Sequence, residues 1–322
     1  MKRNRKLFVE QFGLSQRWAN GRMTLIDVAI ANGADPTVGL IDETAGIFPE
    51  ITQGAARTIK ETSYKTLVCT KNPTVGFRDA NEGGIQDKGV FENRRYECFL
   101  FNPRWECDVA VADRFEDGPE AFITLQGRTT MNGSLQHICR QFYYGAANDE
   151  KGFAGIVNSY DRTKMEVDAG GTTALTSVYA VRWGAQDVQF LWGGDGQGLN
   201  PTQVARIPAS DGKGGTFTAY MQEIMAHVGL QVGSVRSVAR LKKLGTDNGK
   251  GLTDGLLGDL YDIFPAAFPP DAFFMTKRSL GQLRKSRTAT NPTGAEAPYP
   301  TDWNGIPIIV SDAIKNDEDA AL

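Results

Sequence analysis

The feature of this sequence that most constrains its fold is a helical pattern over residues 116–145. Apolar and small residues recur there at steps of three and four, which places them on one face of a single long helix. Glu116 and Asp117 precede Pro119, as is typical of helix N-termini, and Gly145 suits a left-handed C-terminal stop. Such a helix is roughly 40 Å long. The predicted core face consists of Phe122, Leu125, Thr129, Leu135, Ile138, Cys139 and Phe142.

Two glycines inside this helix indicate that it needs support from its surroundings. Gly127 and Gly133 each cost about 1 kcal/mol of helix propensity, so we expect other elements to pack along the helix. The sequence before it favours extended, broken segments, and the sequence after it has the mixed pattern of a compact α/β body. A compact body on a long helix, with arms ahead of it, is a shape suited to assembly.

The composition is that of a globular protein, since 41% of the 322 residues are hydrophobic and the net charge is −3. This length allows one large domain or two smaller ones. A mildly acidic chain is unlike a dedicated nucleic-acid binder, which carries a strong basic excess. No apolar run is long enough to span a membrane, and the basic start lacks the apolar core of a signal peptide, so we expect a cytoplasmic product. Four cysteines without a CxxC pair are expected to be free thiols: Cys69, Cys98, Cys107 and Cys139.

Two different patterns precede the long helix. Residues 1–60 contain short amphipathic pieces, with a helix expected over 24–32 and a second piece over 37–45, and show no core of their own. Residues 61–113 favour strands that form a long hairpin with a loose tip around 81–89. Because an isolated hairpin is only marginally stable, it needs a partner surface, such as another subunit.

The chain after the helix predicts a series of short elements. We expect a turn and short strand over 152–160, a polar loop over 163–176, and a tight strand pair formed by 177–184 and 188–192. Further strands are expected within 217–232 and 234–244, and Thr253 is expected to cap a helix that ends at Phe264. The remaining predicted elements are a buried strand over 272–276, a basic helix over 277–287, a proline-rich loop over 289–304, a buried strand over 306–310 and a mobile acidic tail over 315–322.

A search for chemistry finds no motif that predicts a catalytic residue, a cofactor site or a metal site. The glycines of residues 193–198 lack the spacing of a dinucleotide-binding loop, and Pro201 replaces the helix that should follow. His137 and His227 have no partner at metal-ligand spacing. Cations on the predicted helix 277–287 could touch phosphate, although a solvated surface or a subunit contact is the commoner role: Lys277, Arg278, Arg284, Lys285 and Arg287.

The order of these parts resembles the major capsid proteins of tailed bacteriophages. The resemblance covers nearly the whole chain and is carried by TLIDVA near the start, QFYYG at the end of the long helix, VDAGGT and TSVYAVRWG within 167–184, and the stretch from 275 to 314. It implies an α+β fold, the tailed-phage major capsid fold, with an N-terminal arm (1–60), an extended β-hairpin loop (61–105) and a long spine helix. The spine helix would lie in a peripheral domain (106–165, with 230–246 and 306–322), beside an axial domain (166–229 and 247–305).

The resemblance also implies a function. Such a protein self-assembles as pentamers and hexamers into an icosahedral head that encloses packaged double-stranded DNA, and it is located in the virion. The implied partners are copies of itself, a separate scaffolding protein, a portal and DNA in weak contact, and a decoration protein could also bind. No membrane and no cofactor are implied. One departure is the stretch ARLKKLGTDNGKG, which is more basic than expected for its strand. Charged residues of the hairpin are the candidates for contacts between subunits: Arg78, Asp79, Glu82, Asp87, Lys88, Arg94 and Arg95.

Two other readings stay open on the sequence. An encapsulin-like cellular compartment would have the same fold, and a cytosolic α/β enzyme could use the glycine-rich loop for substrate. The long hairpin without a core of its own argues against the enzyme.

Overall fold

A computed structural model describes residues 48–194, 198–290 and 295–320. Contacts divide the described residues into two compact units. The first contains residues 102–134 and 199–225, and the second contains the rest. The helix expected over 24–32 and the second piece expected over 37–45 lie outside the described residues.

The first unit is a small antiparallel sheet with its own core. Strand β10 (Thr216–Glu223) pairs with both β5 (Arg104–Asp108) and β9 (Ala205–Ser210). Residues predicted to continue β5 instead form the short helix α4 (Val109–Ala112), because the Asp108 side chain accepts a hydrogen bond from the Ala110 N–H at 2.9 Å and caps it. The buried core of this unit consists of Trp105, Cys107, Val111, Ala112, Phe122 and Tyr220.

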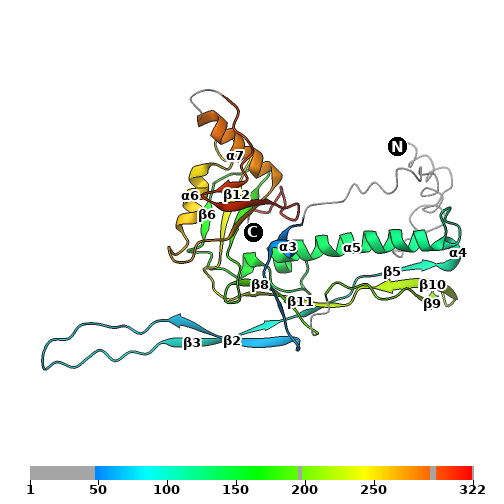
Figure 1. The fold of residues 1–322 in the computed structure, drawn as a ribbon, viewed down its shortest axis with the longest axis horizontal. Helices are drawn as coiled ribbons and strands as arrows, with labels where there is room; N and C mark the ends of the chain where they lie inside the picture. Colours follow the sequence, from blue (N-terminus) through cyan, green and yellow to red (C-terminus); the bar gives the residue numbers. More distant parts are fainter. Residues whose placement is uncertain (1–47, 195–197, 291–294, 321–322) are drawn as a thin grey trace. The chain divides into compact units, whose positions relative to one another are not determined.

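The predicted long helix is confirmed as α5 (Pro119–Tyr144), the green helix of Figure 1. Residues 119–134 of this helix belong to the first unit and residues 135–144 to the second. Phe122, Ile138, Cys139 and Phe142 are buried as predicted, and Leu125 and Leu135 are half-buried. Thr129 is exposed, so its assignment to the core face is wrong. Its hydroxyl donates to the Gln126 carbonyl at 3.0 Å, which satisfies it at the helix surface.

The core of the second unit is a six-stranded sheet in the order β14-β15-β13-β7-β12-β6. Strand β7 (Thr176–Val181) is buried at every residue and lies between β13 (Ala272–Met275) and β12 (Val238–Leu244). The other strands of this sheet are β6 (Glu166–Asp168), β14 (Asp302–Trp303) and β15 (Ile306–Val310). The sheet joins strands from both predicted domains, and the peripheral and axial boundaries stay a prediction.

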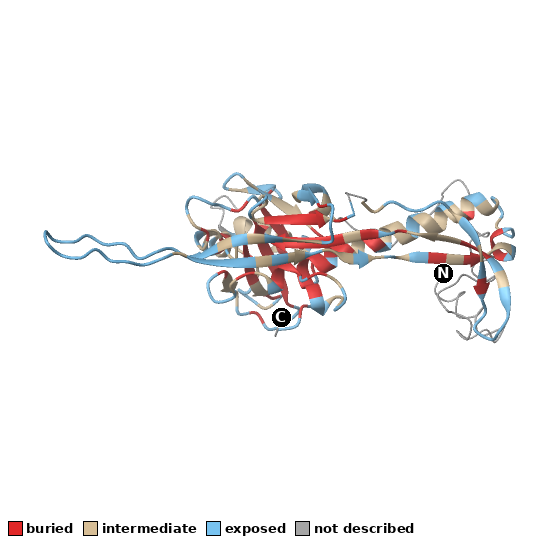
Figure 2. Ribbon diagram, turned by 90° about the horizontal axis from the view of Figure 1, so that it is seen from below, coloured by how far each residue is buried: buried red, intermediate tan, exposed pale blue. Residues whose placement is uncertain are grey.

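A second sheet of this unit has the order β1-β8-β11-β4. It contains β1 (Ala56–Thr58), β8 (Val188–Trp192), β11 (Ala226–Val232) and β4 (Phe99–Phe101). The predicted hairpin is confirmed as β2 (Ser63–Lys71) paired antiparallel with β3 (Val90–Glu97). Figure 2 shows red, buried residues concentrated in the sheets and blue, exposed residues along the hairpin.

The two longer helices after α5 agree closely with those predicted from the sequence. The Thr253 hydroxyl caps α6 (Asp254–Asp262) by accepting from the Leu256 N–H at 3.3 Å. The basic helix is confirmed as α7 (Lys277–Thr290), which continues into the expected loop. The remaining helices of the described unit are α3 (Glu50–Gln53) and the 3₁₀ turns η1 (Gly145–Ala147) and η2 (Ile156–Asn158).

Three local predictions about strands are wrong. Segments 177–184 and 188–192 do not form a strand pair, because β7 and β8 lie in different sheets and share one bridge, between Trp183 and Val188. The expected short strand over 152–160 is the turn η2, and the expected loop over 163–176 contains β6. The last strand is confirmed as β15 but is only partly buried.

The acidic tail is fixed to the sheet, so the expectation that it is mobile is wrong for the described residues 315–320. The Thr176 hydroxyl donates to the Lys315 carbonyl at 2.7 Å, and the Glu318 N–H donates to the Leu175 carbonyl at 2.9 Å. Glu318 itself is buried, with Oε1 accepting from the Tyr144 hydroxyl at 2.7 Å. The C-terminal segment therefore ties the end of α5 to β7.

Candidate assembly surfaces

The hairpin has two faces that the strand register distinguishes. Tyr64 lies opposite Tyr96 and Thr66 opposite Arg94, and these four residues are half-buried. The alternate pairs are Lys65 with Arg95, Leu67 with Asn93 and Cys69 with Phe91, and all six residues are exposed. We call the first set the inner face and the second set the outer face.

The inner face is attached to the second unit by hydrogen bonds to β11 and the residue that follows it. The Tyr64 hydroxyl donates to Oε1 of Gln231, and the Tyr96 hydroxyl donates to the Val232 carbonyl at 3.0 Å. Arg94 donates from Nη1 to the Gly233 carbonyl at 3.4 Å. These bonds hold the base of the hairpin, whereas no described residue outside the hairpin forms a side-chain hydrogen bond with the outer face.

The exposed apolar surface of the described chain is concentrated on the hairpin. On the outer face Leu67 is 67% exposed and Phe91 is 62% exposed. At the tip Val75 and Phe77 are 84% and 108% exposed, and Ile85 is 61% exposed. Burial of such side chains is favourable by about 25 cal/mol per Å² of apolar area, so this surface favours contact with another surface. The sequence predicts only charged residues of the hairpin as contact residues, although the two-residue alternation of apolar positions is a signal that also indicates these side chains.

The predicted contact residues of the tip fall into two groups. Arg78 donates to the Glu82 carbonyl at 2.7 Å, and Asp87 accepts from the Thr74 N–H at 2.8 Å, so both shape the tip. That backbone bond is the main reason why the pKa of Asp87 is lowered from its ordinary value. In contrast, the side chains of Asp79, Glu82 and Lys88 make no hydrogen bond or ion pair with any described residue.

The register separates the other two predicted contact residues, Arg94 and Arg95. Arg94 lies on the inner face, where 26% of its side chain is exposed beside Glu92, and it binds Gly233. Arg95 lies on the outer face, where 58% of its side chain is exposed, and its Nε lies 2.8 Å from Oε1 of Glu97. Only Arg95 is therefore available to another molecule in this arrangement.

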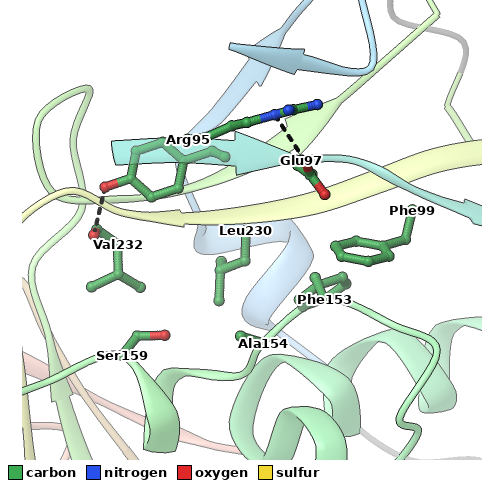
Figure 3. A pocket seen from close by; sticks show the side chains of 9 residues that line it. Arg95, Glu97, Phe99, Phe153, Ala154, Ser159, Leu230 and Val232 are labelled. Carbon is green, nitrogen blue, oxygen red and sulfur yellow. Dashed lines mark hydrogen bonds and ion pairs between the residues drawn. The ribbon is translucent and has the colours of Figure 1, made fainter. Parts of the chain in front are cut away.

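A shallow cavity of about 300 Å³ lies beneath the base of β3 (Figure 3). Phe99, Phe153 and Leu230 give it an apolar floor, and the ion pair of Arg95 with Glu97 lies at its edge. The volume is at the lower end of the range for ligand pockets, and the cavity has few polar groups that converge on one point.

The described part of the chain contains no cluster of side chains of the kind that binds a metal ion. In residues 48–194, 198–290 and 295–320, no three His, Cys, Asp or Glu side chains gather in a way that could hold a metal ion. Burial raises the pKa of the Cys107 thiol to about 11, and His137 stacks on Phe101 with ring centroids 5.8 Å apart. Among the same residues, no helix combines the length and apolar character needed to cross a bilayer.

All three arginines of the basic helix α7 are engaged within the chain. Arg278 donates to the Ala174 carbonyl at 2.6 Å, Arg284 pairs with Glu296, and Arg287 binds Asp254 through Nη2 at 2.7 Å. Three of the five cations that could have touched phosphate are therefore engaged internally, while Lys277 and Lys285 are exposed.

The basic strand that departs from the expected pattern is β12, and its charges have partners on the neighbouring strand and the tail. Lys242 lies 2.6 Å from Glu166, and Lys243 lies 3.0 Å from Asp168. Arg240 is buried and binds Glu318. The charges on β12 are thus explained by cross-strand pairing with β6 and by the tail.

The described residues thus form an extended hairpin, a long helix and three further sheets. Residues 38–322 match the family model described as Major capsid protein GP7. The chain belongs to this family. It is a major capsid protein, a structural component of the phage virion.

One solved structure supports the fold of this capsid protein. It is similar to a chain of the bacteriophage Epsilon15 structure, with 20% identity, a TM-score of 0.74, and coverage of 95% of this chain and 99% of that one. A chain of the procapsid of bacteriophage JBD30 has 12% identity and a TM-score of 0.42, covering 82% of this chain and 90% of that one. No curated protein matches the sequence.

A chain of the SrpI encapsulin complex from Synechococcus elongatus PCC 7942 has 12% identity and a TM-score of 0.45, with coverage of 68% of this chain and 95% of that one. The capsid family match extends over more of this chain, so the encapsulin alternative is not favoured.

Proposed function

We propose that this capsid protein assembles with copies of itself, as pentamers and hexamers, into an icosahedral shell that encloses double-stranded DNA. Membership of the capsid family supports this proposal. A separate scaffolding protein and a portal would take part in assembly, and a decoration protein would have room to bind. The chain would act as a structural protein and not as an enzyme, because its family is one of capsid proteins.

The single observation that supports the mode of assembly is the unpartnered apolar surface of the hairpin. Phe77 and Val75 at the tip, and Leu67 and Phe91 on the outer face, are exposed although they are large and apolar. A second copy of the chain is the partner available in a shell built from this protein. We therefore assign the tip and outer face to the contact with a neighbouring subunit.

The charged candidates divide accordingly. Arg95, Asp79, Glu82 and Lys88 would contact the neighbour, with Arg78 and Asp87 shaping the tip that carries them. Arg94 would hold the hairpin to its own subunit, because it binds the Gly233 carbonyl. In this arrangement Arg95→Ala weakens assembly and leaves the stability of the subunit unchanged.

The test is a variant with a polar tip, Val75→Ser, Phe77→Ser and Ile85→Ser, co-expressed with the other proteins of the head. Thermal unfolding of the soluble subunit should be unchanged, because these side chains are exposed. Particle yield in sedimentation should fall at least tenfold, because each subunit loses apolar contact with its neighbour.

Phe268→Ser is the matched control, since Phe268 is 56% exposed and lies outside the hairpin. Normal particles from the polar-tip variant would show that the tip is a surface loop. A large loss of subunit stability would show instead that the tip belongs to an internal core. A wild-type chain that stays monomeric beside all its head proteins would contradict the shell itself.

A further inference from the structure

The segment of residues 49–59, which precedes the hairpin, is attached to the second unit by few buried groups. Within it only Glu50 and Ile59 are buried. Helix α3 is a single turn, and all three residues of β1 are exposed while they pair with β8. Besides the backbone pairing with β8, Glu50 is therefore one of the two buried side chains through which this segment is attached.

Glu50 is a fully buried carboxyl group whose surroundings suit its neutral form. The Tyr143 hydroxyl donates to Oε1 at 2.7 Å, whereas Oε2 is buried without a hydrogen-bond partner. No lysine or arginine among the described residues forms an ion pair with it. An ionised carboxylate here would have lost its water without gaining a cation.

The groups that face Glu50 cannot supply the missing positive charge. Helix α5 contributes Tyr143 and Cys139, and the segment after β15 contributes Ser311. Burial raises the pKa of Tyr143 and of Cys139 well above their ordinary values, with Glu50 as a further cause, so both stay neutral. Burial likewise raises the pKa of Glu50 above its ordinary value of 4.5, although the nearby Ser311 side chain and the hydrogen bond from Tyr143 oppose that shift.

We propose that Glu50 is a proton-controlled latch, which holds α3 and β1 on the second unit while its carboxyl is neutral and releases them when it ionises. In the closed state, α3 and β1 are attached to the rest of the second unit, and in the open state they are released. The Glu50 carboxyl binds its proton more tightly in the closed state than in the open state. The attachment is therefore strongest at acid pH, and it weakens as the pH rises from 4.5 to the raised pKa of the closed state. Release would free the segment that leads into β2, and this inference does not depend on the proposed shell function.

Hydrogen–deuterium exchange of the full chain, read by mass spectrometry between pH 5 and pH 9 and corrected for the intrinsic pH dependence of exchange, tests this latch. In the wild type, protection of peptides that cover residues 49–59 should fall about tenfold for each pH unit between 5 and the pKa of the closed state. Glu50→Gln keeps an acceptor for Tyr143 and cannot ionise, so its protection should not change with pH. Glu61→Gln, at an exposed position nearby, should behave like the wild type.

A second variant keeps the inference testable if Glu50→Gln does not fold. Tyr143→Phe removes a hydrogen bond that lowers the pKa of Glu50. The pKa of the attached state should therefore rise, and the release should move to higher pH. Wild-type protection that is independent of pH would overturn the latch. The latch would also be overturned if Glu50→Gln showed the wild-type pH dependence, or if Tyr143→Phe moved the release to lower pH.

Discussion

Arg240 and Glu318 form an ion pair in which Nη2 lies 3.1 Å from Oε2, and each side chain is only 2% exposed. The Ser177 hydroxyl joins them, since it donates to Oε2 of Glu318 and accepts from Nε of Arg240 at 3.0 Å. Tyr144 donates to the other carboxylate oxygen at 2.7 Å. One buried carboxylate near the C-terminus thus connects β7, β12 and the end of α5.

Removing one partner of this pair should destabilise the subunit severely. Glu318→Gln leaves the Arg240 charge buried without its main counter-charge, and such a change costs about 3–5 kcal/mol. Urea unfolding of the unassembled subunit measures it. Asp317→Asn, at the exposed neighbouring position, is the control and should change stability by less than about 0.5 kcal/mol. Equal stability of the two variants would show that the tail is not fixed by this pair.

Gly133, inside α5, and Gly155, which lies against the residues that end α5, should respond oppositely to alanine. No described atom lies within 4 Å of a Cβ added at Gly133, so Gly133→Ala should raise stability by about 1 kcal/mol through helix propensity. A Cβ at Gly155 would lie 2.4 Å from the Gly145 nitrogen and 2.7 Å from the Tyr143 carbonyl, so Gly155→Ala should lower stability by about 1–3 kcal/mol. Thermal unfolding of the unassembled subunit checks both, and a loss of stability in both would contradict the open space at Gly133.

The lowered pKa of Asp247 predicts that the stability of the subunit falls at acid pH. Its carboxylate accepts from the Thr172 N–H at 2.7 Å and from the Thr173 N–H at 3.0 Å, and these bonds lower its pKa from 3.8 to about 2. A depressed pKa in the folded state contributes stability above pH 3.8 that is lost as the pH falls towards 2. The melting temperature of Asp247→Asn should therefore lie below that of the wild type at pH 7, and the difference should vanish near pH 2.

The control for that titration is Asp262→Asn, which changes an exposed carboxylate on α6. Its melting temperature should follow the wild-type curve at every pH. A difference between Asp247→Asn and the wild type that stays constant from pH 7 to pH 2 would exclude the titration of Asp247 as its cause.

The sequence by itself determined the elements whose signals are local. The spacing of Phe122, Ile138 and Phe142 predicts α5, because helical periodicity is a property of neighbouring turns. Thr253 predicts the start of α6, because an N-cap acts within three residues. The alternation and the loose tip of residues 61–97 likewise predict the hairpin, and the order of these parts is enough to indicate the capsid family.

Only the tertiary structure decided what depends on pairing between distant segments. β7 lies beside β12 and β13 and not beside β8, since sheet order is set by long-range packing and not by closeness in sequence. The register assigns Arg94 to the inner face and Arg95 to the outer face, and a shift of one residue would have exchanged them. The sequence around Glu318 predicts a solvated acidic tail, yet Glu318 is buried against Arg240, Ser177 and Tyr144. These partners lie far away in the sequence, and only the folded chain brings them together.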